Sequence, residues 1–282
     1  MTICYLTIGR LMVELRSSVM VQSDDISAAQ GYSYRDSHKY DSKGAEYEAF
    51  YQMQPWPRFV WAREQKILLT ILEKYFAGKD VHLLDFACGT GRIAGLLENR
   101  VKTLTGVDVS GSMLSIARQK LQRTEIIEAD ITASNVLNGR KFNLIAAFRF
   151  FLNAEPELRK AAMRALVPLL ADDGYLVFNN HQNRDCAWVK LLIAYRRWRK
   201  IGGIYNTMSV CEMRKLVEDA GLEIVELYPV GFFHPPKTPV SYGLNWAIDE
   251  TLGRFGFLAR FCESPIAVCR RRGGHEAAQV NA

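Results

Sequence analysis

Cysteine spacing in this sequence does not support a metal site or a disulfide framework. The six cysteines are Cys4, Cys88, Cys186, Cys211, Cys262 and Cys269. No two of them have the C-x-x-C spacing of zinc ligands, and their distribution does not indicate a secreted, disulfide-stabilised scaffold. We therefore expect reduced thiols, no bound metal and a cytoplasmic protein.

Long apolar runs and linkers are absent as well. Residues 1–21 lean apolar, but Arg10, Glu14 and Arg16 interrupt them, which excludes a membrane span of about 20 apolar residues and a signal peptide. Because no linker or repeat divides the chain, we expect one domain over residues 39–272, a flexible extension at 1–38 and a flexible tail at 273–282. The net charge of +6 leans toward anionic partners but is too small to indicate nucleic acid.

Short apolar runs alternate with helical patterns from about Asp80 onward. This alternation predicts an α/β fold with a seven-stranded, mostly parallel sheet and helices on both faces. The predicted strands are His82–Ala87, Leu104–Val109, Glu125–Glu128, Phe142–Phe148, Tyr175–Asn180, Glu223–Tyr228 and Ile266–Arg270. The predicted helices are Arg58–Phe76, Gly91–Asn99, Ser112–Gln122, Glu155–Leu170 and a segment ending at Ala220 that Ser209 and Glu212 open as a capping box.

A strand, a small-residue loop and a helix follow one another over Leu83–Arg92. The strand carries Asp85 near its end, and the loop contains Gly89 and Gly91, whose backbone can turn tightly and approach a ligand closely. Asp108 ends the next strand, 23 positions after Asp85, where a carboxylate can bind both hydroxyl groups of a ribose. This pattern predicts a nucleoside-binding site.

The same loop formally fits the G-x-G-x-x-G/A pattern of dinucleotide-binding enzymes. Asp85 counts against that interpretation, because a carboxylate at the strand end would repel a pyrophosphate but would suit a cationic amino group. No Tyr-x-x-x-Lys dyad follows the first strand either. An NAD-binding dehydrogenase therefore stays as the weaker alternative.

The run Asp85-Phe86-Ala87-Cys88-Gly89-Thr90-Gly91 resembles motif I of class I (Rossmann-like) S-adenosylmethionine-dependent methyltransferases, with Ala87 replacing the first glycine. Gly106-Val107-Asp108-Val109-Ser110 is similar to their second strand, and Glu128-Ala129-Asp130-Ile131 to the segment beside the adenine. The resemblance covers about Lys39 to Arg271. It implies a Rossmann-like fold, methyltransferase activity and S-adenosyl-L-methionine as cofactor, but it does not identify the acceptor.

The resemblance also implies cofactor contacts. Loop residues would line the methionine and ribose, Asp108 would bind the ribose hydroxyls, and Arg63 would reach the methionine carboxylate. Tyr40 would belong to a helix that closes over the cofactor. The implied cofactor-binding set is Tyr40, Arg63, Asp85, Ala87, Gly89, Gly91, Asp108, Val109, Met113, Asp130, Ile131 and Phe148. Structural roles stay open for three of them, since Asp130 suits a loop, Met113 can fill a core gap and Tyr40 can be a surface aromatic residue.

The acceptor should lie beyond the carboxyl ends of the central strands, near Phe148–Asn153 and Asn179–Asn183. These segments lack the Asn/Asp-Pro-Pro-Tyr run that marks amino-group methylation of nucleobases and glutamine. We therefore expect a small-molecule or glycan acceptor that is methylated at a hydroxyl oxygen. His181 is the candidate catalytic base, because it lies just past a strand and an ordinary pKa near 6.5 leaves it neutral. A histidine that only hydrogen-bonds the loop is an equal alternative.

Two insertions, 186–206 and 231–263, exceed what the bare fold requires, and their aromatic content argues against disorder. We expect both to form a lid over the acceptor site, with helices over Trp188–Lys200 and Asn245–Phe261. The first helix is amphipathic and basic, so it also suits peripheral contact with a membrane. An RNA-modifying methyltransferase and a non-catalytic cofactor-binding protein remain alternatives, although no recognisable RNA-binding module accompanies the basic residues.

Overall fold

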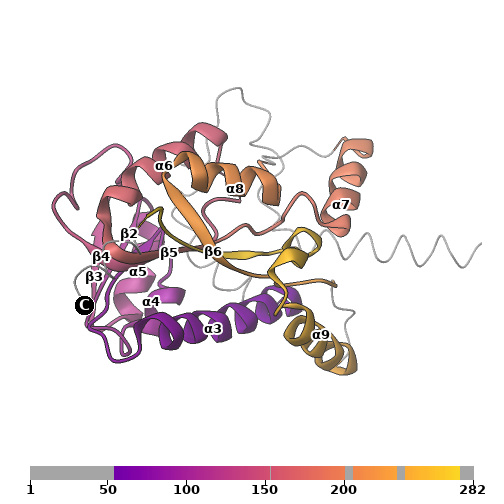
Figure 1. Cartoon of the computed structure of the whole chain (residues 1–282), viewed down its shortest axis with the longest axis horizontal. Coiled ribbons are helices and arrows are strands. Elements are labelled where there is room, and N and C mark those ends of the chain that lie inside the picture. Colours follow the sequence, from indigo (N-terminus) through magenta and orange to yellow (C-terminus); the bar gives the residue numbers. More distant parts are fainter. Residues whose placement is uncertain (1–53, 153, 201–205, 234–238, 274–282) are drawn as a thin grey trace, which may run out of the picture.

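A seven-stranded sheet forms the centre of the molecule, with helices on both faces (Figure 1). The computed structural model describes residues 54–152, 154–200, 206–233 and 239–273. The strand order is β3-β2-β1-β4-β5-β7-β6; β7 runs antiparallel to β5 and β6, and the other pairs are parallel. The strands are β1 His82–Phe86, β2 Thr103–Asp108, β3 Thr124–Glu128, β4 Phe142–Ala147, β5 Leu170–Asn179, β6 Leu222–Tyr228 and β7 Ile266–Arg271. The predicted α/β fold class is confirmed.

The helices divide between the two faces of the sheet. Helices α3, α4 and α5 cover one face, and α6 and α8 cover the other (Figure 1). Their bounds are α3 Pro55–Phe76, α4 Arg92–Leu97, α5 Gly111–Lys120, α6 Pro156–Leu169 and α8 Val210–Asp219. Successive strand residues point to opposite faces, so Leu83 packs under α3 while Leu84 belongs to the core under α6. Burial on both faces explains why the central strands are almost continuously apolar.

The start of β5 differs from the prediction, which placed a turn before Tyr175. The strand begins at Leu170, and its pairing with β4 shifts between Phe142 and Leu144, so the residues around Gly174 form an irregularity inside the strand. A Cβ at Gly174 would lie 3.0 Å from the carbonyl oxygens of Phe142 and Asn143. The glycine therefore permits close backbone approach at this irregularity rather than a turn between two elements.

The second insertion also differs from the single predicted helix over Asn245–Phe261. It contains the helix α9 Pro239–Leu252 and the separate 3-10 helix η2 Gly256–Phe261. The chain turns at Gly253, where an added Cβ would lie 2.3 Å from the carbonyl oxygen of Asp249. Only a glycine fits this approach, and the apolar pattern that spans both segments conceals the turn.

Both insertions join the sheet at the same edge. The first, with helix α7 Ala187–Trp198, follows the carboxyl end of β5 at Asn179, and Asn179 pairs with Ile266, the residue that opens β7 after η2. The expected extension at 1–38 lies outside the described residues. Among the helices that the structure describes, none is both long and apolar enough to cross a membrane.

Candidate active site

The loop after β1 is tightly wound. Ala87, Gly89 and Gly91 all have left-handed backbone conformations, with φ of 56°, 54° and 79°. A Cβ at Gly91 would lie 2.8 Å from Cδ1 of Leu121, so a larger residue would press on this side chain at the end of α5. Ala87 adopts the same region without the freedom of glycine, which places local strain at the position where the family motif has its first glycine.

Asp108 connects this loop to the end of β2. One of its carboxylate oxygens accepts a hydrogen bond from the Gly89 amide at 2.8 Å, and the other accepts from the Ser110 amide at 2.9 Å. A carboxylate at the end of the second strand of such a sheet is the group that can bind ribose hydroxyls. The geometry fits the ribose role implied by the sequence, and that role stays a prediction.

Asp85 is buried beneath the loop, with 1% of its surface exposed. Its carboxyl group accepts a hydrogen bond from the Ala94 amide in the first turn of α4 at 3.1 Å. Burial raises the pKa of Asp85 to about 7, against the opposing effect of this amide. The residue therefore holds the helix start in place, and we infer that it acts on a cofactor through the loop backbone.

The residues implied for the adenine lie around the ends of β2 and β3. Met113 is buried, and its sulfur lies 3.4 Å from the position that a Cβ on Gly89 would occupy. Val109 is partly exposed and Ile131 is buried. Asp130 accepts hydrogen bonds from the amide and hydroxyl of Thr132 at 2.9 and 2.6 Å through one carboxylate oxygen, so it stabilises its own turn. Contacts of these residues with an adenine ring remain predictions.

A buried polar network that the sequence analysis missed lies at the carboxyl ends of β4 and β5. Arg149 follows the buried Phe148, has φ of 65°, and donates its amide to Oδ1 of Asn179 at 2.8 Å. Oε1 of Glu64 in α3 accepts from Nη2 of Arg149 at 3.2 Å and from Nδ2 of Asn179 at 2.8 Å. Oε2 of Glu64 is buried without a hydrogen-bond partner among the described residues. The sequence did carry a signal, because Glu64 interrupts the apolar face formed by Val60 and Leu68.

His181 lies next to this network, just past β5. Its Nε2 is 3.9 Å from Oε1 of Glu263, which is a close electrostatic contact rather than a hydrogen bond. Its Nδ1 is buried and has no hydrogen-bond partner in the described part of the chain. The expectation of an ordinary pKa was wrong. Burial, together with the positive charges of Arg149 and Arg92, lowers the pKa of His181 well below 6.5.

Glu263 is the acidic neighbour of this imidazole and was also missed. Burial raises its pKa to about 7, against the opposing effects of a hydrogen bond with Trp56 and the charge of Arg149. The residue lies at the end of the second insertion, just before β7. Nothing in the sequence between η2 and β7 indicates this contact, which depends on the antiparallel pairing of β5 and β7.

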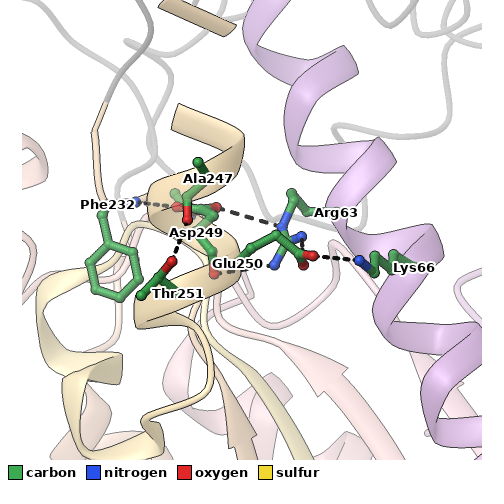
Figure 2. Close-up of polar contacts among 8 residues, drawn as sticks. Arg63, Lys66, Phe232, Ala247, Asp249, Glu250 and Thr251 are labelled. Carbon is green, nitrogen blue, oxygen red and sulfur yellow. Dashed lines mark hydrogen bonds and ion pairs between the residues drawn. The ribbon is translucent and has the colours of Figure 1, made fainter. Parts of the chain in front are cut away.

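Arg63 contacts α9 rather than the loop after β1. Its guanidinium forms an ion pair with Glu250, donates to the carbonyl oxygen of Asp249 at 3.2 Å and lies 4.8 Å from the centre of the Trp246 ring. Figure 2 shows Arg63 and Lys66 of α3 pointing together toward Glu250. We therefore withdraw the prediction that Arg63 binds the methionine carboxylate, because acidic groups of α9 engage it. Tyr40, which was predicted to belong to a helix that closes over the cofactor, lies outside the described residues.

The sequence is similar to those of known methyltransferase-domain proteins. A family model described as "Methyltransferase domain" matches residues 53–227. Nodulation protein S of Azorhizobium caulinodans is 24% identical over 168 residues, which cover 58% of this chain and 76% of that protein. Carboxy-S-adenosyl-L-methionine synthase of Chromohalobacter salexigens is 28% identical over 152 residues, 49% of this chain and 54% of that one.

Solved structures share the fold. A magnesium protoporphyrin IX methyltransferase from Synechocystis, crystallised with SAH, superposes with a TM-score of 0.56 at 15% identity and covers 82% of this chain and 95% of its own. An S-adenosylmethionine-dependent methyltransferase from Thermotoga maritima has a TM-score of 0.59 at 16% identity and covers 82% and 97%.

The strand order, the tight loop after β1 and the acid at the end of β2 define the class I, Rossmann-like methyltransferase fold. Because the family model spans more than half of the sequence, the chain belongs to the methyltransferase-domain family. The predicted enzyme class, an S-adenosylmethionine-dependent methyltransferase, is confirmed.

Proposed function

We propose that this enzyme methylates a small-molecule or glycan acceptor at a hydroxyl oxygen, with His181 as the base. The observation that carries the proposal is the buried pair of His181 and Glu263 at the carboxyl end of β5, where an open α/β sheet binds its ligands. A small acceptor is compatible with one structural neighbour, which is named as a magnesium protoporphyrin IX methyltransferase.

The described residues suit the cofactor on two counts. Asp108 ends β2, where an acid can bind ribose hydroxyls, and the left-handed backbone at Ala87, Gly89 and Gly91 lets the loop pass close to a ligand. When bound, S-adenosylmethionine supplies a methyl group that its sulfonium already activates. The protein's remaining tasks are to align the acceptor, to exclude water and to accept one proton.

In this proposal the two imidazole nitrogens of His181 have different tasks. Nε2 faces Glu263, so the proton of the neutral ring is best placed on Nε2, and the lone pair of Nδ1 then accepts the hydroxyl proton of the acceptor. The low pKa of His181 makes it a weak base on its own. An ionised Glu263 strengthens it, because the carboxylate stabilises the imidazolium that forms during transfer.

We also propose that the insertions 186–206 and 231–263 roof the acceptor site. Both join the sheet at the carboxyl ends of β5 and β6, and the second supplies Glu263 directly. A roof built from apolar residues would exclude water from the reacting groups.

The acceptor is best identified by incubating the purified enzyme with labelled S-adenosylmethionine and cell extract, with and without RNase. We expect a labelled product of low mass or a glycan that survives RNase. His181→Ala should lower turnover of that acceptor roughly a hundredfold, as removal of a general base does, while cofactor affinity stays the same. Labelled RNA would contradict the acceptor class, and wild-type turnover by the variant would contradict the role of His181.

A further inference from the structure

Exposed apolar side chains concentrate in the two insertions. In the described part of the chain, every large apolar side chain that is exposed lies in 186–200 or 231–263, except Val136. Trp198 of α7 is 75% exposed and Phe257 of η2 is 73% exposed. Leu191, Leu244 and Phe261 are each more than half exposed. Scattered exposed apolar residues are ordinary, but such a concentration marks an interaction site.

The two insertions are joined to each other. Nδ2 of Asn183, just before α7, donates to the carbonyl oxygens of Ala259 at 3.2 Å and of Cys262 at 2.9 Å, which belong to η2 and its end. The Asn183 amide donates to the carbonyl oxygen of Glu263 at 2.8 Å. Figure 1 shows α7 and α9 at the end of the molecule opposite β3 and β4. We call this end, formed by the described residues 186–200, 231–233 and 239–263, the insertion surface.

Positive charge accompanies the aromatic residues. Among the described residues of this surface, the charged side chains classed as exposed are all cationic, namely Lys190, Arg197, Arg199, Lys200, Arg254 and Arg260. The described carboxylates of the same segments are buried or paired, because Asp249 and Glu263 are buried and Glu250, which is 31% exposed, pairs with Arg63 and Lys66. The guanidinium groups of Arg199 and Arg260 lie over the rings of Trp198 and Phe261, at 5.8 and 5.3 Å.

We propose that the insertion surface binds the surface of an anionic lipid bilayer. Trp and Phe side chains partition into the boundary between headgroups and acyl chains, and neighbouring Arg and Lys side chains bind lipid phosphates. Charge complementarity selects this partner over a second copy of the chain, because two insertion surfaces would bring only cations together. The inference is independent of which acceptor atom is methylated.

Vesicle flotation of the full chain tests the proposal. The probes are vesicles of phosphatidylcholine alone and of phosphatidylcholine mixed with phosphatidylglycerol. We expect the wild type to float with the anionic vesicles and not with the neutral ones, and to lose binding at high salt. Two double variants should each weaken binding more than about tenfold. One reverses charge, Arg197→Glu with Arg199→Glu, and the other removes aromatic rings, Trp198→Ser with Phe257→Ser.

Matched controls alter similar side chains elsewhere. Arg123→Glu with Arg164→Glu changes two exposed arginines outside the insertions, and Val136→Ser removes the remaining exposed apolar side chain. Both controls should bind like the wild type. Because Trp198 and Phe257 are largely exposed, their serine variants should keep the wild-type melting temperature.

Three results would overturn the proposal. They are failure of the wild type to float with anionic vesicles, equal flotation with neutral vesicles, and equal weakening by the control variants. Light scattering that detects a dimer disrupted by Trp198→Ser, without any vesicle binding, would assign the surface to a second copy instead.

Discussion

At the residue scale, the site depends on acids whose environments differ. Asp108 is held by two backbone amides at the end of β2, whereas Asp85 and Glu263 are buried and each has a pKa raised to about 7. The raised pKa makes the charge of Glu263, and with it the proposed basicity of His181, sensitive to pH near neutrality.

The activity should therefore rise with pH through about 7, because ionised Glu263 stabilises the imidazolium of His181 during proton transfer. Glu263→Gln should lower kcat and abolish this rising limb, while the KM for S-adenosylmethionine stays the same. The measurement is the pH profile of kcat for the identified acceptor. A glutamine variant that keeps the wild-type pH profile would show that Glu263 has only a structural role.

The positions of the loop glycines and of Asp108 in the fold could be predicted from the sequence, whereas the polar network at the carboxyl ends of β4 and β5 could not. Asp108 and the loop glycines occur at a fixed spacing along one strand–loop–helix unit, so local sequence identifies them. Glu64 comes from α3 and bonds Arg149, which follows β4, while Glu263 at the end of the second insertion lies beside His181. These contacts form only in the folded sheet. The same tertiary surroundings lower the pKa of His181, and no local pattern reports them.

At the element scale, the short apolar runs located all seven strands, including the partly exposed edge strands β3 and β6, because polar turns bound them. Two boundaries were predicted wrongly, at Gly174 inside β5 and at Gly253 between α9 and η2. At both positions the close approach of backbone segments determines the structure, and the apolar pattern of the side chains does not report it. The contact between α3 and α9 was likewise not predicted. It depends on Arg63, whose guanidinium donates a hydrogen bond to the carbonyl oxygen of Asp249. The carboxylate of Asp249 accepts hydrogen bonds from the amides of Gly231 and Phe232. One polar cluster therefore joins α3, α9 and the segment after β6 (Figure 2).

Arg63→Gln should therefore destabilise the fold by about 3 kcal/mol, the cost of removing one partner from a buried ion pair. Lys66→Gln is the matched control, because Lys66 pairs with the same Glu250 but is 51% exposed, and it should cost at most about 1 kcal/mol. The checks are urea unfolding and calorimetric titration with S-adenosylmethionine. A large loss of cofactor affinity in Arg63→Gln, with stability unchanged, would restore the original carboxylate-binding prediction.

At the scale of the whole molecule, two apolar cores hold the helices on either face of the sheet, and ionisable groups are buried between them at the carboxyl edge. Stability should depend on pH because of these groups. Asp85 and Glu263 have folded pKa values near 7 and ordinary values of 3.8 and 4.5, so the folded state retains protons that the unfolded state has lost. Their contribution to stability is present at low pH and is lost as pH rises toward about 7.

His181 acts in the opposite direction. Its folded pKa lies below the ordinary 6.5, so its contribution is present above that value and is lost as pH falls. A single variant separates the two effects. Glu263→Gln should gain stability relative to the wild type as pH rises from 5 to 8, with a slope of up to about 1.4 kcal/mol per pH unit. Unfolding free energies at several pH values provide the test, and a constant difference between the two proteins would contradict the raised pKa.

The central claim is that the loop after β1 and the carboxylate of Asp108 bind S-adenosylmethionine. Isothermal titration calorimetry on the wild type, Asp108→Ala and the exposed control Asp173→Ala tests it most directly. We predict binding by the wild type and the control, a loss of about 1.5–3 kcal/mol in Asp108→Ala, and no binding heat with NAD. Unchanged affinity in a folded Asp108→Ala, or a clear NAD signal, would contradict the account.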